Sequence, residues 1–143
     1  MTVLETGVRA GILAGVVSGV PSTLHALATR RDPLAATRAA GSLLLPDEAR
    51  STRLVAAAIP VHFGLSVGWG VMLATVLPRR ATIAWGALAG LTIAALDLSV
   101  PGRRTARTRT LPRWPQVADH LAYGVVAAAV VATAHSEERG VFD

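Results

Sequence analysis

The chain has no cysteine and no lysine, and it is poor in aromatic and charged residues. Without cysteine, disulfides, thiolate metal ligands and a cysteine nucleophile are excluded. All 14 basic residues are arginine, which is typical of a high-GC genome, and aromatic residues make up only 4% of the chain. Charged residues make up 16%, below the roughly 25% that is usual in soluble domains. The composition therefore argues against a soluble globular protein.

Long apolar runs are what the sequence has instead. Hydrophobic residues make up 52% of the chain, and its mean hydropathy is +0.48. About 20 apolar residues, at ~1.5 Å of rise each, cross the ~30 Å hydrocarbon core of a bilayer. Four runs are of this length, over residues 8–28, 54–77, 81–100 and 117–134. The sequence therefore predicts an all-α integral membrane four-helix bundle, with residues 1–143 forming one transmembrane domain.

The loops between the runs carry signals of their own. After the first run, Asp32 and Pro33 have the pattern of a helix N-cap followed by proline at the first helical position. The apolar stretch that follows is too short to cross a bilayer, so we expect a short interfacial or re-entrant helix over residues 33–45. In the loop before the fourth run, Trp114 is placed to anchor the chain at the membrane interface.

Arginines are distributed unequally between the two sides of the predicted bundle. Five lie between the first and second runs and five between the third and fourth, while four lie on the opposite side. The ten are Arg30, Arg31, Arg38, Arg50, Arg53, Arg103, Arg104, Arg107, Arg109 and Arg113. By the positive-inside rule, both loops face the cytoplasm and both termini lie outside, in the inner (cytoplasmic) membrane of the cell. Anionic lipid headgroups, and no nucleic acid, are the predicted partner of these arginines.

Ionisable residues inside the runs gather near one membrane face. If the helices alternate in direction, five of them fall in the cytoplasmic half: His25, His62, Asp97, Asp119 and His120. Such groups cost several kcal/mol at membrane depth, so a same-sided set predicts a functional site. By helical spacing, Ser22 shares a stripe with His25, and Ser66 shares one with His62. We take these seven as candidate binding or relay residues.

Glycines at helical spacing predict close contacts between helices. Gly11, Gly15 and Gly19 are spaced by four residues in the first run, as are Gly86 and Gly90 in the third. The two motifs read Gly-Ile-Leu-Ala-Gly and Gly-Ala-Leu-Ala-Gly, and each is followed by an arginine-rich loop and a histidine-bearing helix. Two alternatives stay open, a pair of parallel repeats of the kind seen in some transporters and a chance similarity between small apolar residues.

A spaced pattern of polar and small residues covers about half the chain. It consists of His62, Ser66, Gly70, Pro78, Gly86, Gly90, Asp97, Asp119 and His120. In this pattern the chain resembles the YagU-like family of small bacterial inner-membrane proteins, which has histidine where this chain has Asp97. The resemblance implies a polytopic inner-membrane protein whose role is connected with acid tolerance.

Three functions stay open for the polar set. The favoured one is proton-linked binding or permeation of a small solute through an Asp/His chain. A second is the binding of a transition metal or haem, with His25, His62, His120 and Asp97 as candidate ligands. A third is an accessory or assembly subunit in which the polar groups only hold helices together.

Enzymatic activity is not favoured. The letters Gly-x-Ser-x-Gly occur at residues 64–68, but they lie inside an apolar helical run, where no nucleophile elbow or oxyanion donor set is visible. A homo-oligomer is expected, by analogy with other short membrane proteins.

Neighbouring candidates are not expected to address one point. Asp119 and His120 are adjacent, so on a helix their side chains point about 100° apart. Asp97 and Asp119 have the alternative of pairing with loop arginines such as Arg103. His62 lies deepest in its run and is the central residue of the predicted site.

Overall fold

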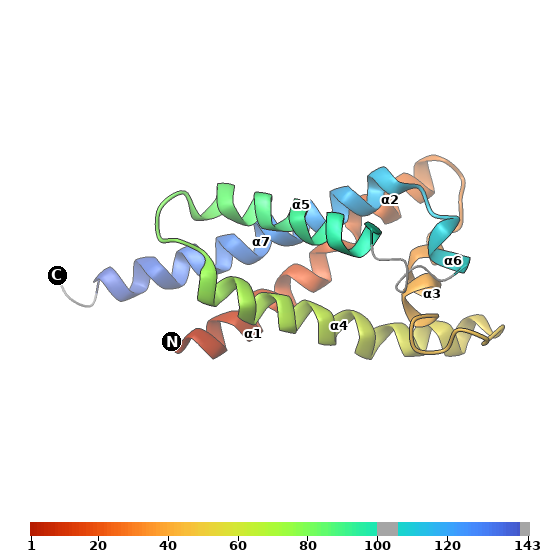
Figure 1. The fold of residues 1–143 in the computed structure, drawn as a ribbon, viewed down its shortest axis with the longest axis horizontal. Coiled ribbons are helices and arrows are strands. Elements are labelled where there is room, and N and C mark those ends of the chain that lie inside the picture. The colour runs from red at the N-terminus through yellow and green to blue at the C-terminus, as the bar shows by residue number, and fades with distance from the viewer. Residues whose placement is uncertain (100–105, 141–143) are drawn as a thin grey trace.

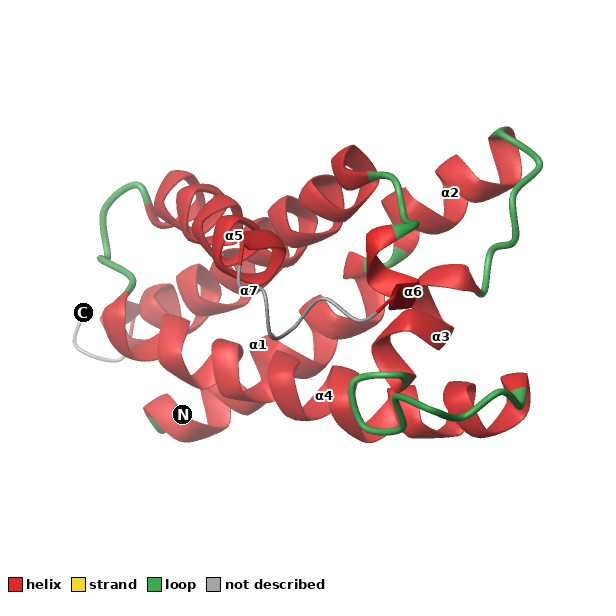
Figure 2. Ribbon diagram, turned by 45° about the vertical axis from the view of Figure 1, so that its right-hand side comes forward, coloured by secondary structure: helices red, strands yellow, loops and turns green. Residues whose placement is uncertain are grey.

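The computed structural model describes residues 1–99 and 106–140, and in this part of the chain every regular element is a helix (Figures 1 and 2). The elements are α1 (Val3–Ser18), α2 (Val20–Ala28), α3 (Ala35–Gly41), α4 (Ser51–Val76), α5 (Thr82–Ser99), α6 (Ala106–Arg109) and α7 (Arg113–Gly140). The all-α fold class predicted from the sequence is confirmed.

Four helical segments are long and apolar enough to cross a membrane, as the sequence predicted. They are Val3–Ala28, Ser51–Val76, Thr82–Ser99 and Arg113–Glu137. The first begins five residues before the predicted start, because Thr2 and Glu5 form a capping box. The Thr2 N–H donates to Glu5 Oε2 at 2.8 Å, and the Glu5 N–H donates to Thr2 Oγ1 at 3.2 Å. The chain has the fold of a multi-pass membrane protein.

The long helices form two antiparallel hairpins that meet along α1 and α7. α4 packs on α1, α5 packs on α7, and α1 packs on α7. The start of α1, the C-terminal end of α7 and the turn between α4 and α5 lie at one end of the molecule, whereas α3 and α6 lie at the other (Figure 1). The predicted alternation of helix direction is therefore present.

The buried cluster where the four helices meet combines small alanines with a few larger apolar side chains. The buried cluster contains Ala10, Ala14, Leu73, Leu77, Ile93, Tyr123, Ala127, Ala128 and Val131. Large apolar side chains lie on the outside instead, among them Val16, Leu24, Ile59 and Leu88. This inside-out distribution fits helices whose outer surfaces contact lipid, because helix contacts within membranes favour small residues.

Glycines set the close approach within the first hairpin. A Cβ added to Gly11 would lie 2.5 Å from the carbonyl oxygen of Ser66, and one added to Gly15 would lie 2.9 Å from Ser66 Oγ. A Cβ at Gly19 would meet nothing within 4 Å. The predicted ridge therefore packs on α4 through Gly11 and Gly15, and Gly19 has a different role.

The second hairpin repeats this packing register. Gly86 lies against Gly124 and Ala128, and Gly90 lies against the backbone of His120. The partners on α4 and α7 have equal spacing, since Ser66 follows His62 by four residues, as Gly124 follows His120. The five-letter motifs of α1 and α5 thus occupy equivalent packing positions, which supports the repeat interpretation over chance similarity.

The first membrane segment is broken at Gly19, which corrects the prediction of a single helix over residues 8–28. α1 ends at Ser18 and α2 begins at Val20. Pro21 lies in the first turn of α2, and it has no N–H to donate to the preceding turn. Proline also occurs inside α4, at Pro60, where the helix continues.

The short helix after the first segment is also shorter than predicted. It covers Ala35–Gly41 and not residues 33–45, and Asp32 is not its N-cap. Asp32 Oδ1 does accept the N–H of Leu34 at 2.9 Å, a capping-type bond, but to the turn that precedes α3, and its other oxygen pairs with Arg38. The helix ends at Gly41, which lies directly against the backbone of Leu54 on α4, and turns follow it.

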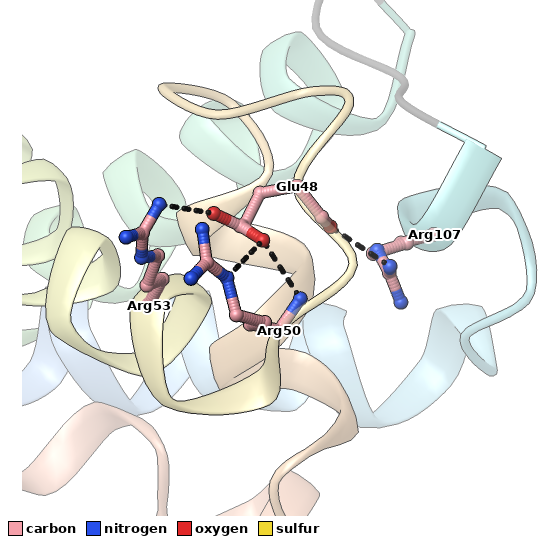
Figure 3. Close-up of polar contacts among 4 residues, drawn as sticks. All are labelled: Glu48, Arg50, Arg53 and Arg107. Atoms are coloured by element: carbon pink, nitrogen blue, oxygen red, sulfur yellow. Dashed lines mark hydrogen bonds and ion pairs between the residues drawn. The ribbon is translucent and has the colours of Figure 1, made fainter.

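Glu48 ties the two arginine-rich loops together (Figure 3). Its carboxylate accepts the N–H and the Nε of Arg50 at 2.9 and 3.2 Å and Arg53 Nη1 at 3.3 Å, while Arg107 Nη2 donates to its carbonyl oxygen at 3.2 Å. The hydrogen bonds from Arg50, with help from Arg53, lower the pKa of Glu48 to about 2. Because this pKa is lowered on folding, the contribution of Glu48 to stability is present above pH 4.5 and is lost as pH falls toward 2.

Candidate functional site: the break in the first membrane helix

The break between α1 and α2 frees a backbone carbonyl, and His62 binds it. In a continuous helix the Gly15 carbonyl would accept the N–H of Gly19, but this N–H bonds to the Val17 carbonyl instead. His62 Nε2, from α4, lies 2.8 Å from the Gly15 oxygen, and Ser18 Oγ donates to the same oxygen at 3.2 Å. A carbonyl oxygen only accepts, so His62 Nε2 carries a proton here.

The start of α2 has a free N–H, and Asp119 binds it. Asp119 Oδ1, from α7, accepts the backbone N–H of Ser22 at 2.8 Å. A carboxylate at this position is favoured because helix N-termini carry partial positive charge. The two ends of the break are therefore held from two different helices, the carbonyl end by an imidazole on α4 and the N–H end by a carboxylate on α7.

His120 and Asp97 form a second polar contact, between α7 and α5. His120 Nδ1 lies 2.7 Å from the Gln116 carbonyl oxygen, and Nε2 lies 3.1 Å from Asp97 Oδ2. Nδ1 must donate to the carbonyl, so Nε2 either donates to an ionised carboxylate or accepts from a protonated one. In both states the pair holds one proton more than a neutral histidine beside an ionised aspartate.

The two contacts share one helix. Asp119, which holds the break, and His120, which pairs with Asp97, are consecutive residues of α7. The side chains of His120 and Asp97 are each 25% exposed, so this region is only partly shielded by the protein. Titratable groups therefore run from α4, across α7, to α5.

Tyr123 is a polar residue of this region that the sequence analysis missed. Its hydroxyl donates to the carbonyl oxygen of Ser66 at 2.5 Å, and both residues are buried. A lone tyrosine one turn after His120 is the signal that was available, since a buried phenol needs a hydrogen-bond partner. Ser66 is held by this bond and by its packing on Gly15.

His25 stands apart from the other histidines. Its ring meets the Trp114 ring edge to face, with centroids 4.6 Å apart. It lines a cavity of about 130 Å³ at the end of α2, as does Ser22. The cavity therefore adjoins the break through Ser22.

Taken together, the candidates form connected groups and not one coordination sphere. His62, Asp119 and Ser22 meet at the break, with Ser66 packed beside them, and His120 pairs with Asp97. Within residues 1–99 and 106–140 there is no group of three or more His, Asp or Glu side chains placed to hold a metal ion. Pairing of Asp97 with Arg103 or Arg104 lies outside the described residues.

No protein-family model, curated protein or solved structure matches the chain. The resemblance to the YagU-like family stays a prediction.

Proposed function

We propose that this multi-pass protein binds or conducts protons together with a small solute, through a relay formed by His62, Asp119, His120 and Asp97. The observation that carries the proposal is the broken membrane helix, whose two free backbone ends are held by titratable side chains from two other helices. Broken helices at membrane depth are a recurring device of transporters, and Asp/His chains move protons in them.

The relay is suited to couple proton occupancy to structure. An ionised Asp119 holds the Ser22 N–H by a charge-assisted hydrogen bond, and a protonated Asp119 holds it more weakly. The protonation of Asp119 therefore changes how firmly α2 is held to α7. One residue along, the His120–Asp97 pair stores the extra proton described above. Imidazole groups exchange protons near neutral pH, which suits this task.

The orientation and partners follow from the arginine distribution. The ten-to-four split supports placing α3, α6 and the arginine-rich loops in the cytoplasm, with both termini outside the inner membrane. Anionic lipid headgroups then surround those loops. A homo-oligomer is part of the proposal, and the YagU-like resemblance agrees with a bacterial inner-membrane protein connected with acid tolerance.

One observation favours a second candidate function, an accessory or assembly subunit of a membrane complex. His62, Asp119 and His120 each have a hydrogen-bond partner within the chain. Groups satisfied in this way can serve only as links between helices. Copurification of a larger partner in fixed stoichiometry, from a membrane expressing the full chain, would favour this candidate.

Proton flux through reconstituted protein tests the relay. Vesicles containing the full chain and a trapped pH-sensitive dye are given a pH gradient while the membrane potential is clamped. We expect wild type to dissipate the gradient faster than protein-free vesicles and Asp119→Asn to conduct no faster than those vesicles. An asparagine still accepts the Ser22 N–H, so this variant keeps the helix contact while losing the titratable group.

Glu137→Gln is the matched control, because Glu137 is an exposed carboxylate at the far end of α7. It should conduct as wild type does. Wild-type flux at the level of protein-free vesicles, or full flux in Asp119→Asn, would overturn the proposed relay.

A further inference from the structure

The cavity at the end of α2 is bordered by α2, by the segment that follows it and by a third segment that is distant in sequence. α2, residues 31–36 and residues 110–116 surround a volume of about 130 Å³. Its polar lining consists of Ser22, His25, Arg31, Asp32, Thr110 and Gln116. Ala26, Leu111 and Pro115 contribute an apolar wall. The volume suits a phosphate or a short carboxylate and is too small for a lipid acyl chain.

The one acidic residue in the wall is already compensated. Asp32 pairs with Arg38 and accepts the N–H of Leu34. Ser22 and Thr110 direct their hydroxyl groups to backbone carbonyls, at 3.2 and 2.8 Å. The negative charge of Asp32 is therefore balanced within the protein, by Arg38.

The remaining polar residues of the wall each offer a hydrogen-bond donor. Within the described part of the chain, the Arg31 guanidinium has neither an ion pair nor a hydrogen bond, and the His25 ring meets the Trp114 ring. Gln116 uses one N–H for the Pro112 carbonyl, at 2.9 Å, and retains a second. A cationic donor beside further donors favours an anionic ligand.

The backbone conformation at Arg30 brings Arg31 to this wall. Arg30 has a φ of 55°, in the left-handed region that usually requires glycine. Its N–H bonds to the Leu27 carbonyl at 3.2 Å, and the Arg31 N–H bonds to the Ala26 carbonyl at 2.8 Å, which closes α2 in a tight turn. This helix end places Arg31 at the start of the segment that lines the cavity.

We propose that this cavity binds a phosphate or carboxylate group through Arg31, with His25 and Gln116 as further hydrogen-bond donors and the apolar wall receiving the attached carbon. The group belongs either to a small soluble anion or to an anionic lipid headgroup at the membrane surface. The inference rests on the proposed function, because the anion would be the solute that the relay serves. Ser22 connects the two sites, since it lines the cavity and donates its N–H to Asp119.

Binding of defined anions to the purified full chain tests the proposal. Inorganic phosphate and butyrate are titrated calorimetrically into protein in neutral detergent. In a second arm, native mass spectrometry measures retention of phosphatidylglycerol against phosphatidylcholine from mixed nanodiscs. We expect saturable binding of a soluble anion, or selective retention of phosphatidylglycerol, to weaken about tenfold in Arg31→Gln, because a charge-assisted contact is lost.

Arg113→Gln is the matched control, since it removes an equal charge at the same end of the molecule from an exposed side chain outside the cavity. Phosphate or butyrate binding identifies a soluble ligand, and selective retention of phosphatidylglycerol alone identifies a lipid headgroup. The proposal is overturned if no probe binds or if both arginine variants weaken binding equally. Anion binding without proton flux would instead overturn the relay alone, and proton flux without anion binding would overturn this inference alone.

Discussion

At the scale of single residues, His62 and Asp119 hydrogen-bond the two backbone groups that the helix break leaves without a backbone partner. The Gly15 carbonyl and the Ser22 N–H lose their partners because the chain turns at Gly19. Each is an obligatory hydrogen-bonding group, and leaving it unpaired in a membrane costs several kcal/mol. His62 and Asp119 supply the missing donor and acceptor. The same two side chains are titratable, so protonation and backbone geometry are linked at this point.

Two substitutions of His62 test how much its hydrogen bond to the Gly15 carbonyl contributes to stability. His62→Leu should lower the free energy of unfolding by about 1 kcal/mol, because the Gly15 carbonyl loses its interhelical donor and keeps only Ser18. His62→Gln retains an N–H donor, so its free energy of unfolding should fall by less than that of His62→Leu. The measurement is reversible unfolding in mixed detergent micelles. His135→Leu is the control, since His135 Nδ1 has no partner within the described residues. Equal stability of His62→Leu and wild type would contradict this role.

The sequence predicted the importance of His62 but not its partner. Its depth in an apolar run was enough to mark it as costly unless bonded. Its acceptor exists only because the first membrane helix is broken, and hydropathy does not report a break. Pro21 was the available signal, but Pro60 sits in a helix that continues, so proline alone does not decide the matter.

At the scale of elements, glycines on one helix face act differently from glycines on the other. On α4, Gly70 lies against α1, where a Cβ would be 2.5 Å from the Gly11 nitrogen. Gly64 and Gly68 lie on the opposite side of the same helix, and a Cβ at either would meet nothing within 4 Å. The four-residue spacing of Gly64 and Gly68 thus marks an open face, whereas the same spacing of Gly11 and Gly15 on α1 marks a packed one. Only the structure distinguishes the two.

A pair of alanine substitutions tests this distinction. Gly11→Ala should destabilise the protein by roughly 1–3 kcal/mol, because its methyl group would press on the Ser66 carbonyl and force α1 away from α4. Gly64→Ala should be neutral or slightly stabilising, since alanine favours a helix over glycine and space is open there. Thermal unfolding of both variants in one detergent provides the comparison. Equal effects would show that the α1–α4 contact is looser than described.

Element boundaries followed local chemistry more than hydropathy. The capping box of Thr2 and Glu5 lies before the apolar run and extends the first helix toward the N-terminus. Asp32 makes the expected kind of bond to the Leu34 N–H, but it caps a turn at residues 33–34, and α3 begins only at Ala35. Run length and composition were sufficient to predict the four spans, because a bilayer imposes that length on any helix that crosses it. They could not specify the ends.

At the scale of the whole molecule, packing places one titratable contact within each hairpin and one between the hairpins. His62 joins α4 to α1, His120 joins α7 to Asp97 on α5, and Asp119 on α7 holds the start of α2. The proposed relay would therefore run from α4 across α7 to α5. Alternating helix directions predicted that the polar residues gather toward one end, because that argument needs only four crossings. The division into a break site, a His–Asp pair and a separate His25 required knowledge of which helices are neighbours.

Membrane orientation is a property of the whole molecule that cysteine labelling can determine. The chain has no native cysteine, so single substitutions need no altered background. With ten arginines on one side and four on the other, Arg31→Cys should react with an impermeant maleimide only from the cytoplasm, and Ser136→Cys only from outside. Both positions are exposed. Arg31 follows α2 and Ser136 lies in the C-terminal part of α7, and these two parts lie at opposite ends of the molecule (Figure 1). Labelling of Ser136→Cys from the cytoplasm would reverse the orientation and place the α2 cavity on the outer face, while the contacts at the helix break, which do not depend on orientation, would stand.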